Sequence, residues 1–192
     1  MLLQLLLTLV PACLGLSVDD LSGRTYNDIG EYNNPKLRTF LWLDLAVGRE
    51  TNVSSPGSLG IMAPNVKGGK ATGAFEADIL PLGASWEDAV IDELGENSFY
   101  KNRYILQTVN NDTIKFEVDV ILNYRNNAHH GFGFGKFATD IPALLEINYN
   151  SYLVEVTGDF ETGKAAGQVF ALKSGGRRDG QPIKALLPPG GS

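Results

Sequence analysis

The sequence predicts an all-β protein, a single antiparallel β-barrel with one or two short helices. Sustained helical periodicity is missing, and short apolar runs are broken by Gly, Asn and Pro. Several of these runs alternate apolar and polar residues with a period of two, as a strand with one buried face does. Many short strands at close spacing are typical of an antiparallel barrel or sandwich.

Composition limits the classes of function. The chain has 192 residues, of which 43% are hydrophobic and 20% are charged, which suits one folded domain with a real core. A net charge of −6 without a Lys/Arg cluster argues against nucleic acid or an anionic membrane as partner. One Cys excludes a disulfide framework, and no paired His/Cys spacing indicates structural zinc. Composition and cysteine count therefore indicate a folded globular protein without a structural metal site; they name no reaction and leave the oligomeric state open.

The first 17 residues, MLLQLLLTLVPACLGLS, carry no charged side chain. This run is too short to span a bilayer, which needs ~20 apolar residues. Gly15 and Ser17 suit the −3 and −1 sites of a cleavage after Ser17, so we predict a secretory signal peptide. The alternatives are a buried N-terminal helix and a bacterial lipoprotein signal ending at Cys13. The expected organisation is a signal peptide at 1–17, a β-barrel domain at 18–173 and a flexible Gly/Pro-rich tail at 174–192.

Two N-glycosylation sequons agree with secretion. They begin at Asn52 (Asn52-Val53-Ser54) and at Asn111 (Asn111-Asp112-Thr113), each between apolar runs. With the signal peptide they indicate a glycoprotein of the eukaryotic secretory pathway or extracellular space. After signal cleavage we expect no stable association with a membrane.

The individual strands follow from local patterns. The run Thr39–Val47 is β-rich and mostly apolar, which predicts a strand buried on both faces with Trp42 in the core. The run Gly73–Leu80 alternates, with Phe75, Ala77 and Ile79 on one face. Two further strands, at Tyr152–Thr157 and Gln168–Lys173, complete the set.

The clearest hairpin joins Tyr100–Val109 to Ile114–Tyr124 through the turn signal Asn110-Asn111-Asp112. In its second strand, even-numbered apolar residues from Ile114 to Tyr124 share one face, and the polar residues share the other. A short helix is predicted at Ser85–Val90, with Ser85 as N-cap and acidic residues in the first turn. A second is predicted at Ile141–Leu145.

Two runs in the central part of the chain carry a recognisable pattern. Leu37–Gly48 (LRTFLWLDLAVG) is a strand of mostly apolar residues, and Lys67–Trp86 (KGGKATGAFEADILPLGASW) contains a Gly-Gly turn, a further strand and a signature that ends in Trp. In these features the chain resembles a family of small β-barrel proteins known as domain of unknown function 3237, whose signature is similar to "PGGADW". The resemblance continues through Asn97–Phe116 and Tyr152–Leu172 and implies the barrel fold. Ser85 stands where the family signature usually has Asp, so no function is carried over from that residue.

By signal peptide, small size and barrel fold, the chain is also similar to fungal cofactor-free enzymes of secondary-metabolite biosynthesis. The type suggested is the hetero-Diels–Alderase of tropolone-sesquiterpenoid biosynthesis. Such a lyase-type enzyme removes water from a tropolone alcohol and joins the resulting quinone methide to a terpene alkene. This similarity implies an apolar, oxygenated natural product as substrate.

The candidate site residues combine titratable and aromatic side chains. His129 and His130 are the only histidines, and the sequence GFGFG follows them. Imidazole titrates near neutrality and exchanges protons with a bound ligand. The alternative is a solvated hairpin loop with exposed histidines. As catalytic residues we expect His130, Tyr124 and Arg103, and the expected ligand-binding residues are Trp86, His129, Phe132, Phe134 and Phe116.

Two of these assignments depend on which strand face looks inward. If the polar face of the hairpin points into the barrel, Arg103, Lys115, Glu117 and Asp119 form a charged cavity; if it points outward, they are surface pairs. Trp86 is expected either as a flat wall at a barrel mouth or as an ordinary core residue.

Signatures of covalent and nucleotide chemistry are missing. The sequence has no GxSxG, P-loop or HExxH motif. The first hypothesis is therefore a cofactor-free enzyme that orients reactants in a barrel pocket and excludes water. The alternatives are a lipocalin-like carrier without catalysis, and a secreted structural or surface protein whose barrel interior is filled.

Overall fold

The structure is a computed structural model that describes residues 31–48, 51–53, 61–63, 66–92, 95–159 and 161–186. The predicted signal peptide lies outside these residues and stays a prediction. The chain divides into two compact units, residues 34–174 and residues 1–33 with 175–192, and each is described by itself.

The larger unit is a β-barrel, as the sequence predicts. Its ten strands follow the order β2-β3-β5-β4-β1-β10-β9-β8-β7-β6, and β5 also pairs with β6. That last pairing closes the strands other than β2 and β3 into a ring, and every pairing among the described strands is antiparallel. The strands are β1 (Lys36–Val47), β2 (Thr51–Val53), β3 (Ile61–Ala63), β4 (Val66–Gly73), β5 (Ala77–Asp92), β6 (Gly95–Gln107), β7 (Thr113–Arg125), β8 (Ala128–Ala138), β9 (Tyr152–Asp159) and β10 (Lys164–Lys173).

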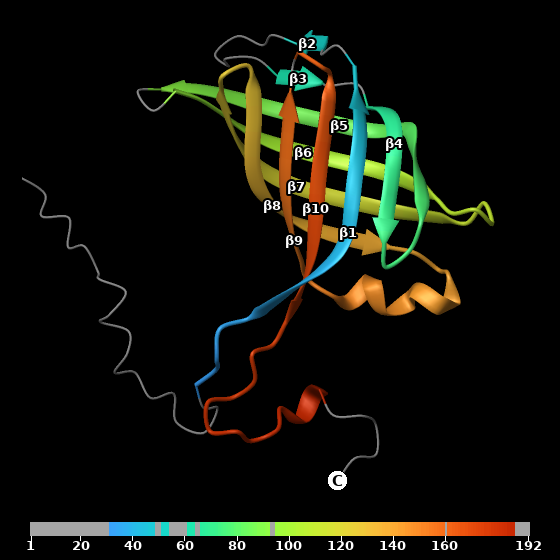
Figure 1. The fold of residues 1–192 in the computed structure, drawn as a ribbon, viewed down its shortest axis with the longest axis vertical. Coiled ribbons are helices and arrows are strands. Elements are labelled where there is room, and N and C mark those ends of the chain that lie inside the picture. Colours follow the sequence, from blue (N-terminus) through green and yellow to red (C-terminus); the bar gives the residue numbers. More distant parts are fainter. Residues whose placement is uncertain are drawn as a thin grey trace, which may run out of the picture. The chain divides into compact units, whose positions relative to one another are not determined.

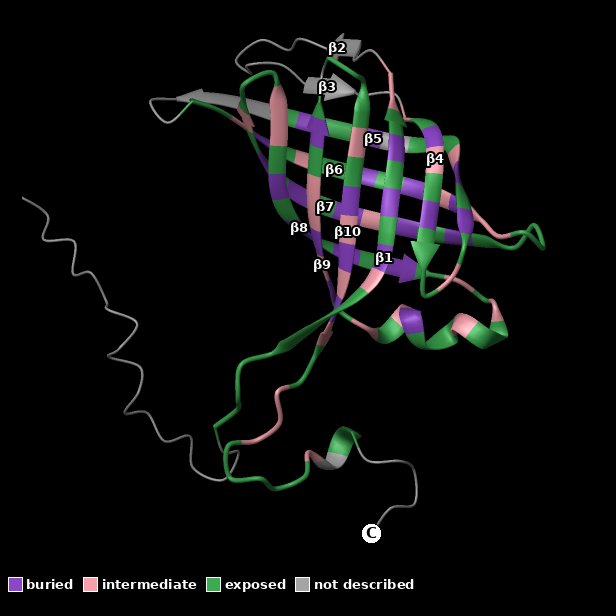
Figure 2. Cartoon of the chain, in the orientation of Figure 1, coloured by how far each residue is buried: buried purple, intermediate pink, exposed green. Residues whose placement is uncertain are grey.

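The strands form two crossing layers. In Figure 1, β1, β4, β9 and β10 run in front of β5, β6 and β7, which cross behind them. Buried and exposed residues alternate along β7 and β8 and along the part of β1 from Leu41 to Leu45, so one face of these strands lines the interior (Figure 2). In β7 the buried residues are those predicted from the alternation: Ile114, Phe116, Val118, Val120 and Leu122.

One end of the barrel is filled by aromatic rings. Phe116 stacks on Phe137 with ring centroids 4.4 Å apart, and Tyr152 packs against Phe137 at 4.9 Å. The helix η2 (Pro142–Tyr149), a 3-10 helix, covers this end, since the Tyr152 hydroxyl donates to the Ile147 carbonyl at 3.4 Å. This confirms the short helix expected from Ile141, although it begins one residue later and extends four residues further.

The first strand departs from its prediction. In β1, Leu41, Leu43 and Leu45 are buried, while Trp42 between them is 53% exposed. The expectation of burial on both faces, with Trp42 in the core, is therefore wrong. A barrel has only one interior, so a strand in its wall buries alternate residues even when its outward residues are apolar.

The predicted strand at Gly73–Leu80 begins too early. β4 ends at Gly73, a bend follows, and β5 begins at Ala77. The faces are as expected from that point on, because Ala77 and Ile79 are buried and Asp78 is exposed.

The helix predicted at Ser85–Val90 is wrong, because these residues belong to β5. Each of them pairs with a residue of β6, from Ser85 opposite Asn102 to Val90 opposite Asn97. Ser85 and Glu87 are buried, whereas Trp86 is 52% exposed. Ser-Trp-Glu-Asp suits a helix start locally, but the interstrand hydrogen bonds of a long hairpin override that preference.

The sequence GFGFG lies within β8 and is not a loop. Gly131, Gly133 and Gly135 face inward and are buried, and Phe132 and Phe134 point outward. A Cβ at Gly131 would lie 1.9 Å from the backbone oxygen of Ile121 on β7, so the two backbones approach too closely for a side chain. Glycine at this position lets β8 curve across the barrel toward η2 (Figure 1).

The smaller unit contains a short ribbon. Tyr32 bridges Arg177 in an antiparallel sense, and the Asn33 amide donates to the Gly176 carbonyl at 2.9 Å. Arg178 also forms an ion pair with Glu31. A short 3-10 helix, η3 (Lys184–Leu186), follows. β10 ends at Lys173, where the predicted tail begins, and the flexibility of that tail stays a prediction.

Candidate functional site: a polar belt in the barrel cavity

The end of the barrel away from η2 contains a cavity of about 780 Å³. This volume is within the range of small-molecule sites, about 300–1,000 Å³. Much of its wall is apolar and comes from strands on both layers: Leu45, Val47, Val66, Val120, Leu122 and Val156. The hairpin between β7 and β8 borders it, turning through Asn126 and Asn127 with φ of 53° and 58°.

A belt of polar side chains runs inside the barrel beside this apolar wall. Strand register explains it, since Glu87 on β5 pairs with Tyr100 on β6, and Tyr124 on β7 pairs with His129 on β8. Two pairs of inward-facing positions on neighbouring strands therefore carry polar residues, although the β7 residue opposite Tyr100 is Val120. We call these residues the polar belt: Ser85, Glu87, Ser98, Tyr100, Asn102, Tyr124 and His129.

The belt is internally hydrogen-bonded. The Tyr124 hydroxyl donates to the Glu87 carboxylate, and Ser98 donates to the Tyr124 oxygen at 3.4 Å. The Ser85 hydroxyl donates to the Asn102 side-chain oxygen. Glu87 is 1% exposed, and carboxylates are rarely buried to this degree unless they are paired or functional. Its burial at the cavity wall and its hydrogen bond from Tyr124 make Glu87 a candidate for proton transfer to a bound ligand.

Tyr104, two residues after Asn102 on β6, adds a hydroxyl to the cavity wall. Burial, and to a lesser extent the nearby Tyr100, raises the pKa of Tyr104 far above its ordinary value. Its hydroxyl therefore stays protonated and can donate a hydrogen bond to a ligand oxygen. The belt thus combines an acceptor, the Glu87 carboxylate, with a donor that does not ionise near neutral pH.

His129 packs against Tyr124, with the two ring centroids 5.8 Å apart. Its ring lies over Gly158 of β9, where an added Cβ would come within 2.2 Å of the His129 Cε1 atom. Glycine at 158 therefore leaves the space that the imidazole occupies. Burial, together with the neighbouring His130, lowers the pKa of His129 below 6.5, so the ring is neutral at pH 7.

This shift predicts a pH dependence of stability. The unfolded chain protonates His129 at about pH 6.5 and the folded chain only at lower pH, so stability present above pH 6.5 is lost as the pH falls. We expect His129→Gln to reduce the slope of the urea midpoint between about pH 5 and about pH 7.5, where histidine titrates. His130→Gln is the matched control for removal of an imidazole. Equal slopes for wild type and His129→Gln would contradict the assignment.

The structure separates the residues that the sequence proposed for a site. Tyr124 and His129 line the cavity. His130, Arg103, Trp86, Phe132 and Phe134 lie on the outer face of the barrel, and Phe116 is fully buried among the aromatic rings of the filled end. Adjacent strand residues point to opposite faces, so His129 points into the barrel and His130 points outward.

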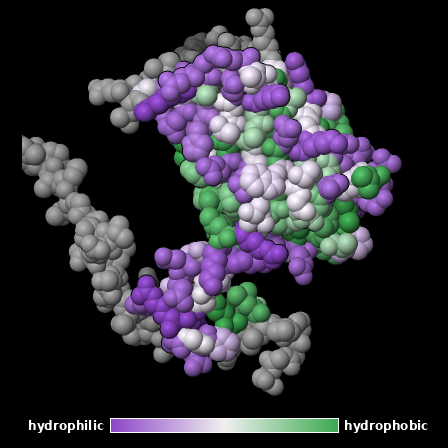
Figure 3. All heavy atoms as spheres, in the orientation of Figure 1, coloured by the Kyte–Doolittle hydropathy of each residue, from purple (hydrophilic) through white to green (hydrophobic). Residues whose placement is uncertain are grey.

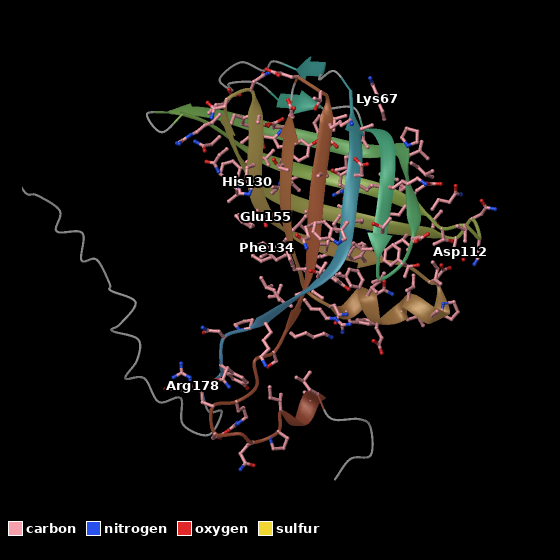
Figure 4. All side chains as sticks on the ribbon, in the orientation of Figure 1. Lys67, Asp112, His130, Phe134, Glu155 and Arg178 are labelled. Atoms are coloured by element: carbon pink, nitrogen blue, oxygen red, sulfur yellow. The ribbon has the colours of Figure 1, made fainter. Side chains whose placement is uncertain are left out.

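The outward residues have partners of their own. His130 contacts Glu155 of β9, with its Nε2 atom 2.9 Å from the Glu155 Oε1 atom. Figure 4 labels these two residues and Phe134 close to one another at the left of the barrel. Arg103 pairs with Glu117 at 3.2 Å, and Lys115 pairs with the same carboxylate at 3.4 Å. The polar face of the hairpin therefore points outward, as the second of the two interpretations expected.

Sequence reasoning missed Glu87, Ser98 and Asn102. Glu87 was assigned to a helix, which hid the alternation Ser85, Glu87 against Trp86, Asp88. As a strand, the same residues place a carboxylate on the inward face, and this was the available signal.

The sequon residue Asn111 lies in an exposed turn, and Asn52 lies in β2.

Two further properties concern the described residues. Among them, no group of three or more His, Cys, Asp or Glu side chains gathers as a metal site requires. In the same part of the chain, no helix has the length and apolar character needed to cross a membrane.

No family model matches this chain, and no curated protein matches it. Solved structures are similar in fold. A protein of unknown function from Clostridium acetobutylicum has a TM-score of 0.63 at 13% identity, covering 73% of this chain and 100% of that one. A β-barrel-like protein from Acinetobacter baumannii has a TM-score of 0.61 at 17% identity, covering 74% and 100%.

A third similar structure is described as an enzyme from Penicillium herquei. Its TM-score is 0.54 at 12% identity, and the match covers 74% of this chain and 98% of that one. At these identities the likeness shows the fold alone, a β-barrel, and the function must be argued from the pocket itself.

Proposed function

We propose that this protein is a cofactor-free enzyme that binds an apolar, oxygenated small molecule in the barrel cavity and catalyses an acid–base reaction on it. The observation that carries the proposal is the buried Glu87 carboxylate, hydrogen-bonded by Tyr124 at the wall of a cavity of about 780 Å³. Apolar walls suit the hydrocarbon part of such a ligand, and the polar belt suits its oxygen atoms.

A dehydration fits this arrangement and needs no oxidant. The Glu87 carboxylate takes a proton from one hydroxyl of the substrate, and the electron pair left on that oxygen forms a carbonyl as the conjugated carbon–oxygen bond of a second hydroxyl breaks. That second hydroxyl leaves as water with the proton that Glu87 returns. Tyr104, whose hydroxyl stays protonated, donates a hydrogen bond to the oxygen on which negative charge develops. The apolar walls hold the reactive product away from solvent and beside its reaction partner.

Within this class we propose the specific reaction that the sequence resemblance suggests. A dehydrating hetero-Diels–Alder reaction forms a quinone methide from a tropolone alcohol and adds it to a terpene alkene. Support comes from the apolar wall of the cavity and from the two residues Glu87 and Tyr104, which would transfer the proton and donate a hydrogen bond. It also comes from a fold neighbour, from a fungus, that is described as an enzyme. Secretion, glycosylation at Asn52 and Asn111, and membership in the domain-of-unknown-function family 3237 belong to the same proposal.

The alternative function is a carrier of the same ligand. The cavity supports it equally, because binding needs the walls and the belt but no proton transfer. The hypothesis of a structural protein with a filled interior is disfavoured by a cavity of this volume.

Native mass spectrometry of the purified protein, followed by extraction and identification of bound molecules, tests the proposal. We expect a small apolar metabolite at near one-to-one stoichiometry, and conversion of its hydroxylated precursor when that precursor is added. A retained ligand that never changes on incubation would assign the carrier function. A protein that binds neither product nor precursor would contradict both.

A further inference from the structure

The outer surfaces of β6 and β7 carry an unusual strip of residues. This strip lies on the side of the barrel that faces away from the viewer in Figure 1 and in Figure 3, which has the same orientation. We define the β6–β7 strip by its four cross-strand pairs: Asn97 with Asn123, Phe99 with Ile121, Lys101 with Asp119, and Arg103 with Glu117.

Part of the strip consists of apolar side chains that are exposed to solvent. Phe99 is 52% exposed and Ile121 beside it is 56% exposed. On β8, Phe132 pairs with Ile121 and is 49% exposed, and Phe134 next to it is 69% exposed. Four large apolar side chains together on an outer barrel face indicate a surface that another molecule covers.

The charges of the strip are divided by strand. Its cations, Lys101 and Arg103, are on β6, and its anions, Asp119 and Glu117, are on β7 at the same levels. Consider a twofold axis that runs parallel to β6 and β7, over the outer surface of the barrel and midway between the two strands. It places each β6 residue of one copy opposite the β7 residue of the same level in the second copy.

The pairs that result are complementary at every level of the strip. Lys101 meets the second copy's Asp119. Arg103, which pairs with Glu117 of its own chain at 3.2 Å, also meets the second copy's Glu117, so the two intrachain pairs join in one network of alternating charge. Phe99 packs on Ile121, and Asn97 faces Asn123, whose amides can both donate and accept. An interface between identical copies requires a surface that complements itself in this way. We propose that this protein forms a twofold dimer through the β6–β7 strip, with the exposed phenylalanines of β8 at its edge.

Charge reversal tests the dimer, with sedimentation velocity and multi-angle light scattering as readouts. Lys101→Glu places a glutamate opposite the second copy's Asp119, and Asp119→Lys places a lysine opposite the second copy's Lys101. We expect each variant alone to raise the dimer Kd at least about 100-fold, because like charges face each other in the interface. Circular dichroism and thermal melting verify that each variant is folded.

Mixing the two variants gives the decisive measurement. In the mixed dimer, the glutamate introduced in one copy faces the lysine introduced in the other, and the remaining Asp119 faces the remaining Lys101. Association should therefore return to near the wild-type Kd, whereas an effect confined within one chain cannot be repaired by mixing.

Lys70→Glu is the matched control, because Lys70 and Asp78 form an exposed cross-strand pair at 3.9 Å elsewhere on the barrel. We expect this variant to dimerise like wild type. A wild-type monomer at about 100 μM, far above the Kd of stable complexes, would overturn the proposal, as would a mixture that stays monomeric.

Discussion

Replacing Glu87 by glutamine should lower the turnover of the natural substrate by about 100- to 10,000-fold, the usual range for loss of a general acid–base. Glutamine keeps the volume of the side chain and still accepts the hydrogen bond from Tyr124. It cannot take up a proton, however, so the step that Glu87 performs is lost while the cavity keeps its shape. The measurement is product formation from the precursor identified by native mass spectrometry.

The neighbouring residue supplies the control for this variant. Asp88 is exposed on the opposite face of the same strand, so Asp88→Asn removes one carboxylate without touching the cavity. We expect Asp88→Asn to turn over like wild type, and Glu87→Gln to retain unreacted precursor. Normal turnover by Glu87→Gln would exclude Glu87 as the proton-transfer group. Equal ligand binding in both variants, without turnover in wild type, would favour the carrier.

Phe116→Ala should cost about 3–5 kcal/mol of unfolding free energy, as truncation of a buried phenylalanine usually does. Phe116 is fully buried, and its ring stacks between Phe137 at 4.4 Å and Tyr104 at 5.9 Å. Removal of the ring leaves a void among aromatic side chains that the closed strands cannot collapse to fill. Urea unfolding monitored by fluorescence measures the loss.

Phe134→Ala is the matched control, because the same side chain is 69% exposed there. We expect a change within about 0.5 kcal/mol, the usual range for surface positions. A small effect at Phe116 would contradict a tightly packed filled end. A large effect at Phe134, if it depends on protein concentration, would instead reflect the proposed dimer.

These two variants probe opposite ends of one barrel. The end of the barrel that η2 covers is filled by packed aromatic rings. The other end is less densely packed and contains the cavity with the buried Glu87 side chain. Stability and function are thus separated along the barrel axis. Glu87→Gln should change turnover more than stability, and Phe116→Ala the reverse.

Patterns with a strong local signal were predictable. The β6–β7 hairpin follows from the Asn110-Asn111-Asp112 turn and from the alternation of Ile114–Tyr124, because strand periodicity and turn residues act over a few neighbours. The short helix η2 begins within one residue of its predicted start. Tyr124 and His129, which their chemistry suggests as site residues, both line the cavity, and their role stays a prediction.

Patterns that depend on distant partners were not predictable. The segment from Ser85 to Val90 reads locally as a helix start, and only pairing with β6 makes it a strand. That single difference concealed Glu87. The sequence around His129, His130 and GFGFG leaves a solvated hairpin loop open as an alternative, and only the close approach of β7 to Gly131 shows why β8 has glycine on its inward face.

Local chemistry along the chain was enough to specify the all-β class, the main hairpin and the alternation of β7, because these features depend on neighbouring residues. β7 encodes its inward face by its own alternation, but β1 and β8 carry large apolar residues on the outward face, and β5 carries a carboxylate on the inward one. For these strands closure of the barrel decided which face looks inward. It placed His129 in the cavity and His130 outside, and it brought Glu87 to Tyr124 across 37 positions of sequence. Closing a sheet into a ring selects one face as interior for all strands at once.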